Sequence, residues 1–155
     1  MSASLWPALV SFVHLLGGGI WIGAVGFNVF VLHPRAARFF AEPGRFEDFV
    51  FTVVSGMRWW VVAGIVSLAG AGLELMRLHR LELDLVLIAK LGLLFVTTAM
   101  FGVLSWRMWP ARVVAAPHEL AAVHRRFSRI GAVMVACNLA NAMLGVWHHV
   151  LRVEP

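Results

Sequence analysis

Four ionisable residues lie inside long apolar stretches of this sequence: His14, Arg58, Glu74 and Lys90. An ionisable side chain within hydrocarbon is costly, so a functional site is the first hypothesis for each of them. Imidazole is a ligand for both haem iron and copper, which makes His14 the leading candidate for cofactor binding. A neutral histidine that makes one hydrogen bond inside a helix bundle is the alternative for His14. The sequence assigns no catalytic residue.

Position within the apolar stretches brings three polar groups to a similar depth. His14 and Lys90 lie eight and seven residues inside the start of their stretches, about 10–12 Å from one boundary at 1.5 Å per residue. Asn141 lies nine residues before Val150, near the same level. We therefore predict a cofactor-binding site that contains His14, Lys90 and Asn141. A metal ion at this end would have His14, His148 and His149 as candidate ligands.

Structural roles compete with these functional ones. Glu74 and Lys90 are equally well interpreted as an ion pair between two helices, and Lys90 can also extend towards the membrane boundary. Arg58 is flanked by two tryptophans, which favours an anchor at the membrane interface. His148 and His149 can be solvated residues at a helix end, and Asn141 can be a residue that hydrogen-bonds one helix to another.

The elements that must position these groups are four apolar segments, each near or above the ~20 residues that span hydrocarbon. They run over residues 6–32, 57–76, 83–108 and 130–150. Hydrophobic residues make up 61% of the 155 residues and charged residues 14%, whereas a soluble domain is usually about a quarter charged. Backbone groups must pair internally in lipid, so we predict helices. The predicted fold is all-α, one transmembrane domain over 1–155 that forms an antiparallel four-helix bundle.

Small and polar residues recur at helical spacing in each segment, so each helix should have one face that packs inside the bundle. Glycines on such a face let neighbouring backbones approach closely. These faces contain His14, Gly17, Gly18 and Trp21; Ser67, Gly70, Ala71 and Glu74; Lys90 and Thr97; and Asn138, Asn141, Gly145 and His148.

The connections are predicted as loops over 33–56 and 109–129, with a tight turn between the second and third helices. Pro110 is expected to end the third helix, and a short surface helix is expected after Pro117. His33 and His124 fall in these loops, where solvation is expected.

The arginines set the expected orientation. Eight lie on the side of the first and third loops, Arg35, Arg38, Arg45, Arg107, Arg112, Arg125, Arg126 and Arg129, against Arg77, Arg80 and Arg152 on the other. Cytoplasmic loops carry the excess of basic residues, so both termini should be non-cytoplasmic in a multi-pass protein of the cell inner membrane. No basic residue precedes the first stretch, which is expected to be a retained helix rather than a signal peptide.

Composition also limits the classes of partner. The net charge of +5 comes from loop arginines, as membrane topology requires, and does not indicate nucleic acid. A single cysteine, Cys137, excludes an intrachain disulfide and a metal site made of cysteines alone. The expected partners are the lipid bilayer and a second copy of the chain or another membrane subunit.

Three stretches resemble CopD-like membrane proteins and, more distantly, HemJ-type protoporphyrinogen oxidases. HLLGGGIWIGAVGFNVFVLHPR contains a histidine followed seven residues later by tryptophan, at His14 and Trp21. LIAKLGLLFVTTAMFGVLSWR places Lys90 where these families have a helix lysine, and HRRFSRIGAVMVACNLANAMLG is similar to the start of their final helix.

The two branches imply different functions. The CopD-like branch implies copper handling, and the HemJ-type branch implies a haem b oxidoreductase with His14 as haem ligand and Lys90 as substrate or propionate partner. The sequence lacks the LPR stretch and the Lys-Pro-Phe ending of the oxidases, which favours the copper branch. A non-catalytic membrane subunit with a structural polar core is the third reading.

Overall fold

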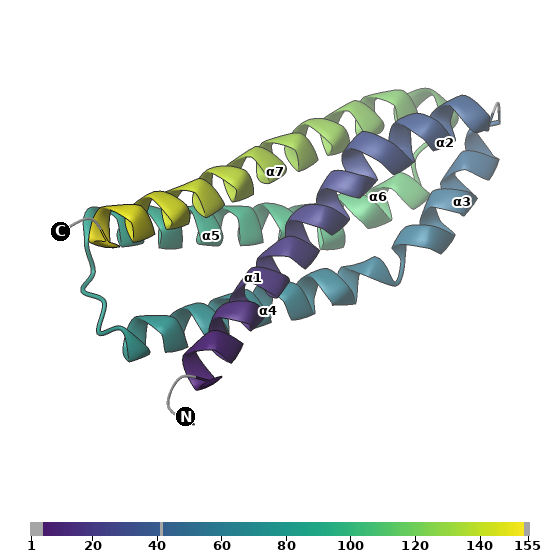
Figure 1. Ribbon diagram of the computed structural model, residues 1–155. Helices are drawn as coiled ribbons and strands as arrows, with labels where there is room; N and C mark the ends of the chain where they lie inside the picture. Colours follow the sequence, from purple (N-terminus) through teal and green to yellow (C-terminus); the bar gives the residue numbers. More distant parts are fainter. Residues whose placement is uncertain (1–4, 41, 154–155) are drawn as a thin grey trace.

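A computed structural model describes residues 5–40 and 42–153 of the chain and shows an all-α fold (Figure 1). Four continuous helices are long and apolar enough to cross a membrane, over Leu5–Phe39, Gly44–Leu78, Leu85–Arg112 and His118–His148. No strand occurs among the described residues. The predicted four-helix membrane bundle is therefore confirmed, and the chain is a multi-pass membrane protein.

The helices extend further than the apolar segments alone predicted. α1 (Leu5–Gly26) continues through the π-helix η2 (Phe27–Leu32) into α2 (His33–Phe39), and α3 (Pro43–Val54) leads into α4 (Met57–Leu78). α5 (Leu85–Gly102) continues through the π-helix η3 (Val103–Met108) into α6 (Trp109–Val113), and α7 spans Pro117–Val153. The segments 33–56 and 109–129, predicted as loops, are thus mainly helical.

Two prolines account for the two π-helices. Pro34 follows η2 by two residues and Pro110 follows η3 by two residues, each at the start of the next α-helical segment. A proline has no N–H and its ring collides with the carbonyl four residues earlier. Inside a membrane a local π adjustment can pair the freed backbone groups again and let the helix continue. The expectation that Pro110 ends the third helix was therefore wrong.

The long helices are arranged as two pairs. α1 packs along α4 and α5 packs along α7, and α1 also contacts α7. At one end of the bundle, called here the loop end, the pairs are joined by α2, α3, α6 and the start of α7 (Figure 1). At the other, called the terminal end, α1 begins, α7 ends and α4 turns into α5, and the two pairs diverge.

Glycine permits the close crossing of α1 and α4. A Cβ added at Gly17 would lie 2.7 Å from the Gly64 carbonyl oxygen and 2.9 Å from the Leu68 nitrogen. The two backbones therefore touch, as the helical spacing of Gly17 predicted. Gly19 and Gly23 of the same helix have no neighbouring atom within 4 Å of such a Cβ, so they take no part in this contact.

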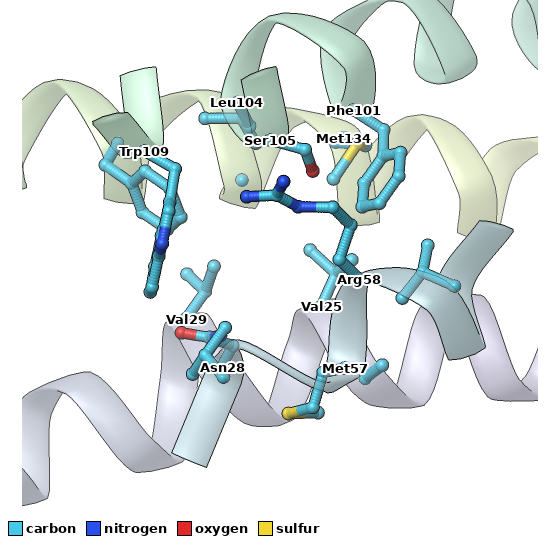
Figure 2. A pocket seen from close by; sticks show the side chains of 15 residues that line it. Val25, Asn28, Val29, Met57, Arg58, Phe101, Leu104, Ser105, Trp109 and Met134 are labelled. Atoms are coloured by element: carbon cyan, nitrogen blue, oxygen red, sulfur yellow. The ribbon is translucent and has the colours of Figure 1, made fainter. Parts of the chain in front are cut away.

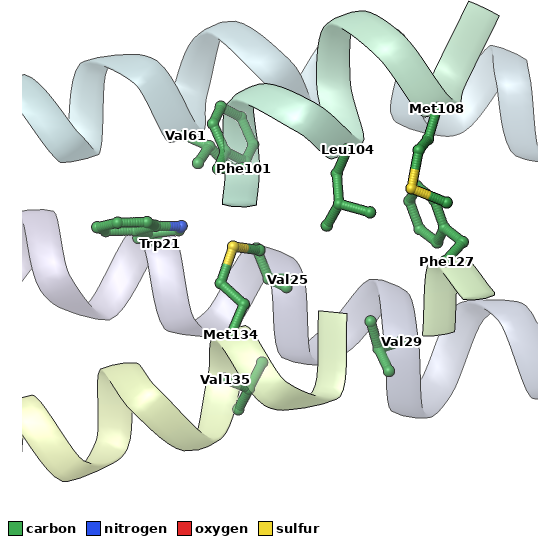
Figure 3. Packing of buried hydrophobic residues seen from close by; sticks show 10 residues of the cluster. All are labelled: Trp21, Val25, Val29, Val61, Phe101, Leu104, Met108, Phe127, Met134 and Val135. Carbon is green, nitrogen blue, oxygen red and sulfur yellow. The ribbon is translucent and has the colours of Figure 1, made fainter. Parts of the chain in front are cut away.

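The apolar core lies between the two pairs, from the middle of the bundle towards the loop end (Figure 3). Trp21, 1% exposed, and Met134, with no exposed surface, are its largest completely buried side chains. Many other large apolar side chains are exposed, such as Leu15 at 73% and Phe95 at 76%. Such a surface suits hydrocarbon rather than water as the surrounding solvent.

Candidate functional site

His14 is held against α4 by a backbone hydrogen bond. Its Nδ1 lies 2.9 Å from the Leu68 carbonyl oxygen. A carbonyl oxygen only accepts, so Nδ1 carries the hydrogen, and in the neutral ring Nε2 keeps its lone pair. Gly72 makes room for the imidazole, because a Cβ there would lie 3.1 Å from Cε1. The helix crossing thus fixes both the ring and the tautomer that presents Nε2 as a ligand.

Lys90 occupies a matching position in the other helix pair. Its Nζ packs over Gly145 of α7, where an added Cβ would lie 2.6 Å from it. Asn141 donates from Nδ2 to the backbone oxygen of Lys90 at 3.3 Å, which links α7 to α5. The Asn141 Oδ1 is buried without a hydrogen-bond partner. The predicted polar face of α5, with Lys90, therefore contacts the predicted polar face of α7, with Asn141 and Gly145.

His14 and Lys90 therefore belong to different helix pairs, towards the terminal end where the pairs diverge. No carboxylate in the described part of the chain pairs with Lys90. The arrangement places the His14 imidazole on α1, against α4, and the Lys90 ammonium on α5, against α7.

Glu74 is paired differently from the prediction. Its carboxylate accepts from Arg77 Nη2 at 2.6 Å and from Nε at 2.7 Å, and the Trp6 indole donates to it at 3.0 Å. The expected ion pair with Lys90 is not formed. Arg77 lies three residues further along the same helix, within easy reach of the carboxylate.

His148 is also engaged in a structural contact. Its Nε2 lies 2.7 Å from Asp84 Oδ2, while Asp84 Oδ1 accepts from the Leu87 N–H at 2.8 Å and caps the start of α5. Asp84 thereby ties the beginning of α5 to the end of α7. The side chain of His149 lies outside the described residues. Among the side chains that are described, no group of three or more His, Cys, Asp or Glu is placed to hold a metal ion.

A second polar cluster, which we call the loop-end network, contains His33, Glu47, Arg112 and His124. Arg112 is only 2% exposed and donates to Glu47 Oε2 at 2.9 Å. The other Glu47 oxygen pairs with His124 Nε2. Each residue comes from a different segment (α2, α3, α6 and α7), so the network fastens all four together.

His33 completes the loop-end network as an acceptor. Arg112 Nη1 lies 3.2 Å from His33 Nε2. A guanidinium can only donate, so this nitrogen keeps its lone pair and the ring is neutral. The imidazole stacks on Phe127, with ring centroids 5.6 Å apart, and Arg112 lies 5.2 Å from the centroid of the same ring. The expectation that His33 and His124 are solvated loop residues was wrong.

The sequence held only a weak signal for this network. Its members lie in hydrophilic stretches, where histidine and arginine are usually solvated. One sequence feature did indicate burial here: each of two basic segments contains a phenylalanine, Phe46 or Phe127, and both are buried.

The fold and its polar groups define a multi-pass α-helical membrane protein, with His14 hydrogen-bonded through Nδ1 towards the terminal end and a buried ionic network at the loop end. No family model, curated protein or solved structure matches the chain.

Proposed function

We propose that this chain is a haem-binding membrane protein in which His14 would hold the haem iron, near the terminal end of the bundle. The observation that carries the proposal is the Leu68 carbonyl at 2.9 Å from His14 Nδ1, which leaves Nε2 available. A metal-bound histidine usually has its other nitrogen fixed by such a second hydrogen bond. The resemblance to CopD-like and HemJ-type proteins supports this proposal, because the HemJ-type branch implies His14 as a haem ligand.

The donor set favours haem over a copper ion. Haem iron needs only one or two axial ligands from the protein, because the porphyrin supplies four nitrogens. Copper would need further histidine, cysteine or methionine ligands beside His14, and the described histidine, cysteine and acidic side chains form no such group. When bound, haem would supply one-electron chemistry.

The other residues of the site would bind and orient the cofactor. Lys90 provides a cation that can pair with a propionate, and it has no carboxylate partner in the described part of the chain. The Asn141 Oδ1 is buried and unpartnered, so a donor brought by a ligand would remove the cost of leaving it unpaired. Gly72 and Gly145 leave space beside the two functional side chains.

The proposed orientation of the site follows from the distribution of the arginines. With the arginine-rich loop end in the cytoplasm, His14 and Lys90 open to the non-cytoplasmic side of the inner membrane. Copper handling, which the CopD-like resemblance implies, would use the same His14 nitrogen at the same side. Copper handling therefore remains the alternative that the experiment must distinguish from haem binding.

Purification of the protein from cells supplied with both haem precursor and copper tests the proposal. We expect a Soret band and about one iron per chain, with little copper. His148→Ala is the matched control for substitution of His14, because it removes a histidine that already pairs with Asp84. Copper without a Soret band would instead support copper handling, and the absence of both would leave only a structural role for the polar groups.

A further inference from the structure

A pocket opens between the two helix pairs near the loop end (Figure 2). α1, α4, α5 and α7 all contribute to its lining, as do both π-helices. Asn28 of this pocket lies fourteen residues beyond His14, about 21 Å along the helix at 1.5 Å per residue. The pocket is therefore separate from the proposed haem site.

The pocket combines apolar walls with a cation. Val25, Phe101 and Met134 form much of the wall, and the Arg58 side chain extends across the space towards Ser105 and Trp109 (Figure 2). The Arg58 guanidinium carbon lies 5.4 Å from the centroid of the Trp106 ring. No carboxylate of the described residues pairs with this guanidinium. An arginine in such surroundings favours a ligand with an anionic oxygen.

Asn28 adds a second polar requirement. It is 8% exposed, it lines the pocket from η2, and its Oδ1 is buried without any hydrogen-bond partner. An unpaired buried acceptor is costly, and a ligand that brings a donor would remove the cost. The ligand should therefore carry both an anionic oxygen and a hydrogen-bond donor.

The π-helices place these groups in the wall. η2 contributes Asn28 and Val29, and η3 contributes Leu104 and Ser105. π-Helical turns inside α-helices occur frequently at functional sites. Here Pro34 and Pro110 produce both turns at the same level of the bundle, so the local backbone irregularity and the unpaired polar group coincide in one pocket.

We propose that this pocket binds one anionic phospholipid of the adjoining leaflet, with its phosphate on Arg58 and a head-group hydroxyl donating to Asn28 Oδ1. The apolar wall holds part of an acyl chain. A lipid is favoured over a soluble anion because the walls are apolar and the protein surface around the bundle suits hydrocarbon. Phosphatidylglycerol has this combination of phosphate and hydroxyl.

Native mass spectrometry of the full chain in detergent tests the proposal with defined lipids of identical acyl chains. The wild-type protein should retain one phosphatidylglycerol and release phosphatidylcholine. Arg58→Gln should weaken phosphatidylglycerol retention about tenfold or more, because a charge-assisted contact is lost. Arg107→Gln is the matched control, since Arg107 is an exposed arginine of η3 outside the pocket.

Phosphatidylmethanol isolates the role of Asn28, because it has the same charge and no head-group hydroxyl. The wild-type protein should prefer phosphatidylglycerol to phosphatidylmethanol, and Asn28→Leu should abolish that preference. This comparison of two lipids still tests the head-group contact with Asn28 if Arg58→Gln does not fold. Helical content by circular dichroism would show whether Arg58→Gln folds.

Three results would overturn the proposal. Equal loss of lipid in Arg58→Gln and Arg107→Gln would indicate general attraction between arginines and anionic lipid. Unchanged lipid preference in Asn28→Leu would remove the head-group contact. Displacement of the lipid by glycerol phosphate at a similar concentration would identify a soluble anion as the ligand instead. None of these results depends on haem binding.

Discussion

Arg112 is the residue on which the loop end depends most. It is 2% exposed, its Nη1 contacts His33, and its Nη2 contacts Glu47. His33 accepts a hydrogen bond from the guanidinium but carries no negative charge, so Glu47 is the residue that neutralises Arg112. Loss of one partner of a buried ion pair leaves the other charge uncompensated, which costs more than the pair itself contributes.

Glu47→Gln should therefore destabilise the protein by about 3 kcal/mol. The change keeps the shape of the side chain and removes only its charge, so Arg112 is left buried and unneutralised. Equilibrium unfolding in detergent, followed by circular dichroism, measures the effect. Glu42→Gln is the control, because the Glu42–Arg45 pair is exposed on both sides and should contribute little. Similar destabilisation by the two substitutions would contradict this account of the loop-end network.

At the scale of the elements, the helices follow from local sequence and their contacts from small residues. Two prolines convert one turn each of two membrane helices to π geometry, without ending the helices. Gly17 and Gly64 bring α1 and α4 into backbone contact, and that contact places the Leu68 carbonyl beside His14. The proposed ligand geometry at His14 is thus a consequence of how closely two helices cross.

Gly17→Ala should separate α1 from α4 and lower stability by about 1 kcal/mol or more, since overpacking forces the backbones apart. Gly19→Ala is the matched control on the same helix, where an added Cβ meets no atom within 4 Å. Helical content against the mole fraction of a denaturing detergent would compare the two variants. If Gly17→Ala were as stable as Gly19→Ala, the close crossing would not be a requirement of the fold.

The sequence predicted the helices better than it predicted their ends or their polar contacts. Four spans could be predicted because lipid requires long apolar helices with internally paired backbones. The loop end could not, because the burial of His33, Arg112 and His124 arises from contacts between segments far apart in the chain. Pro110 was wrongly expected to end the third helix, because proline usually breaks a helix in water, whereas a helix in lipid continues past it. The pairing of Glu74 with Arg77 was readable from their spacing of three residues.

On the scale of the whole molecule, the two helix pairs are joined at the loop end and diverge at the terminal end (Figure 1). Polar groups gather at both ends and apolar packing lies between them. The loop-end network fastens four segments together, whereas His14 and Lys90 lie on different helix pairs near the terminal end. This division suits a protein with one fixed end and one end that accepts a ligand.

The proposed orientation can be tested with single cysteines in a Cys137→Ala background. Glu82→Cys lies in the turn between α4 and α5 at the terminal end, and Glu42→Cys lies just before α3 at the loop end; both positions are exposed. A membrane-impermeant maleimide added to intact spheroplasts should label Glu82→Cys and spare Glu42→Cys. Labelling of Glu42→Cys alone would place the termini in the cytoplasm and reverse the proposed opening of the site.

The visible absorption spectrum of His14→Gly protein, with and without added imidazole, tests the central claim most directly. This substitution leaves a space beside Gly72 where free imidazole can take the place of the side chain. We predict that the Soret band of the wild-type protein is lost or strongly diminished in His14→Gly and returns when imidazole is added. A Soret band that is unchanged in His14→Gly without imidazole would contradict the proposal that His14 would hold the haem iron.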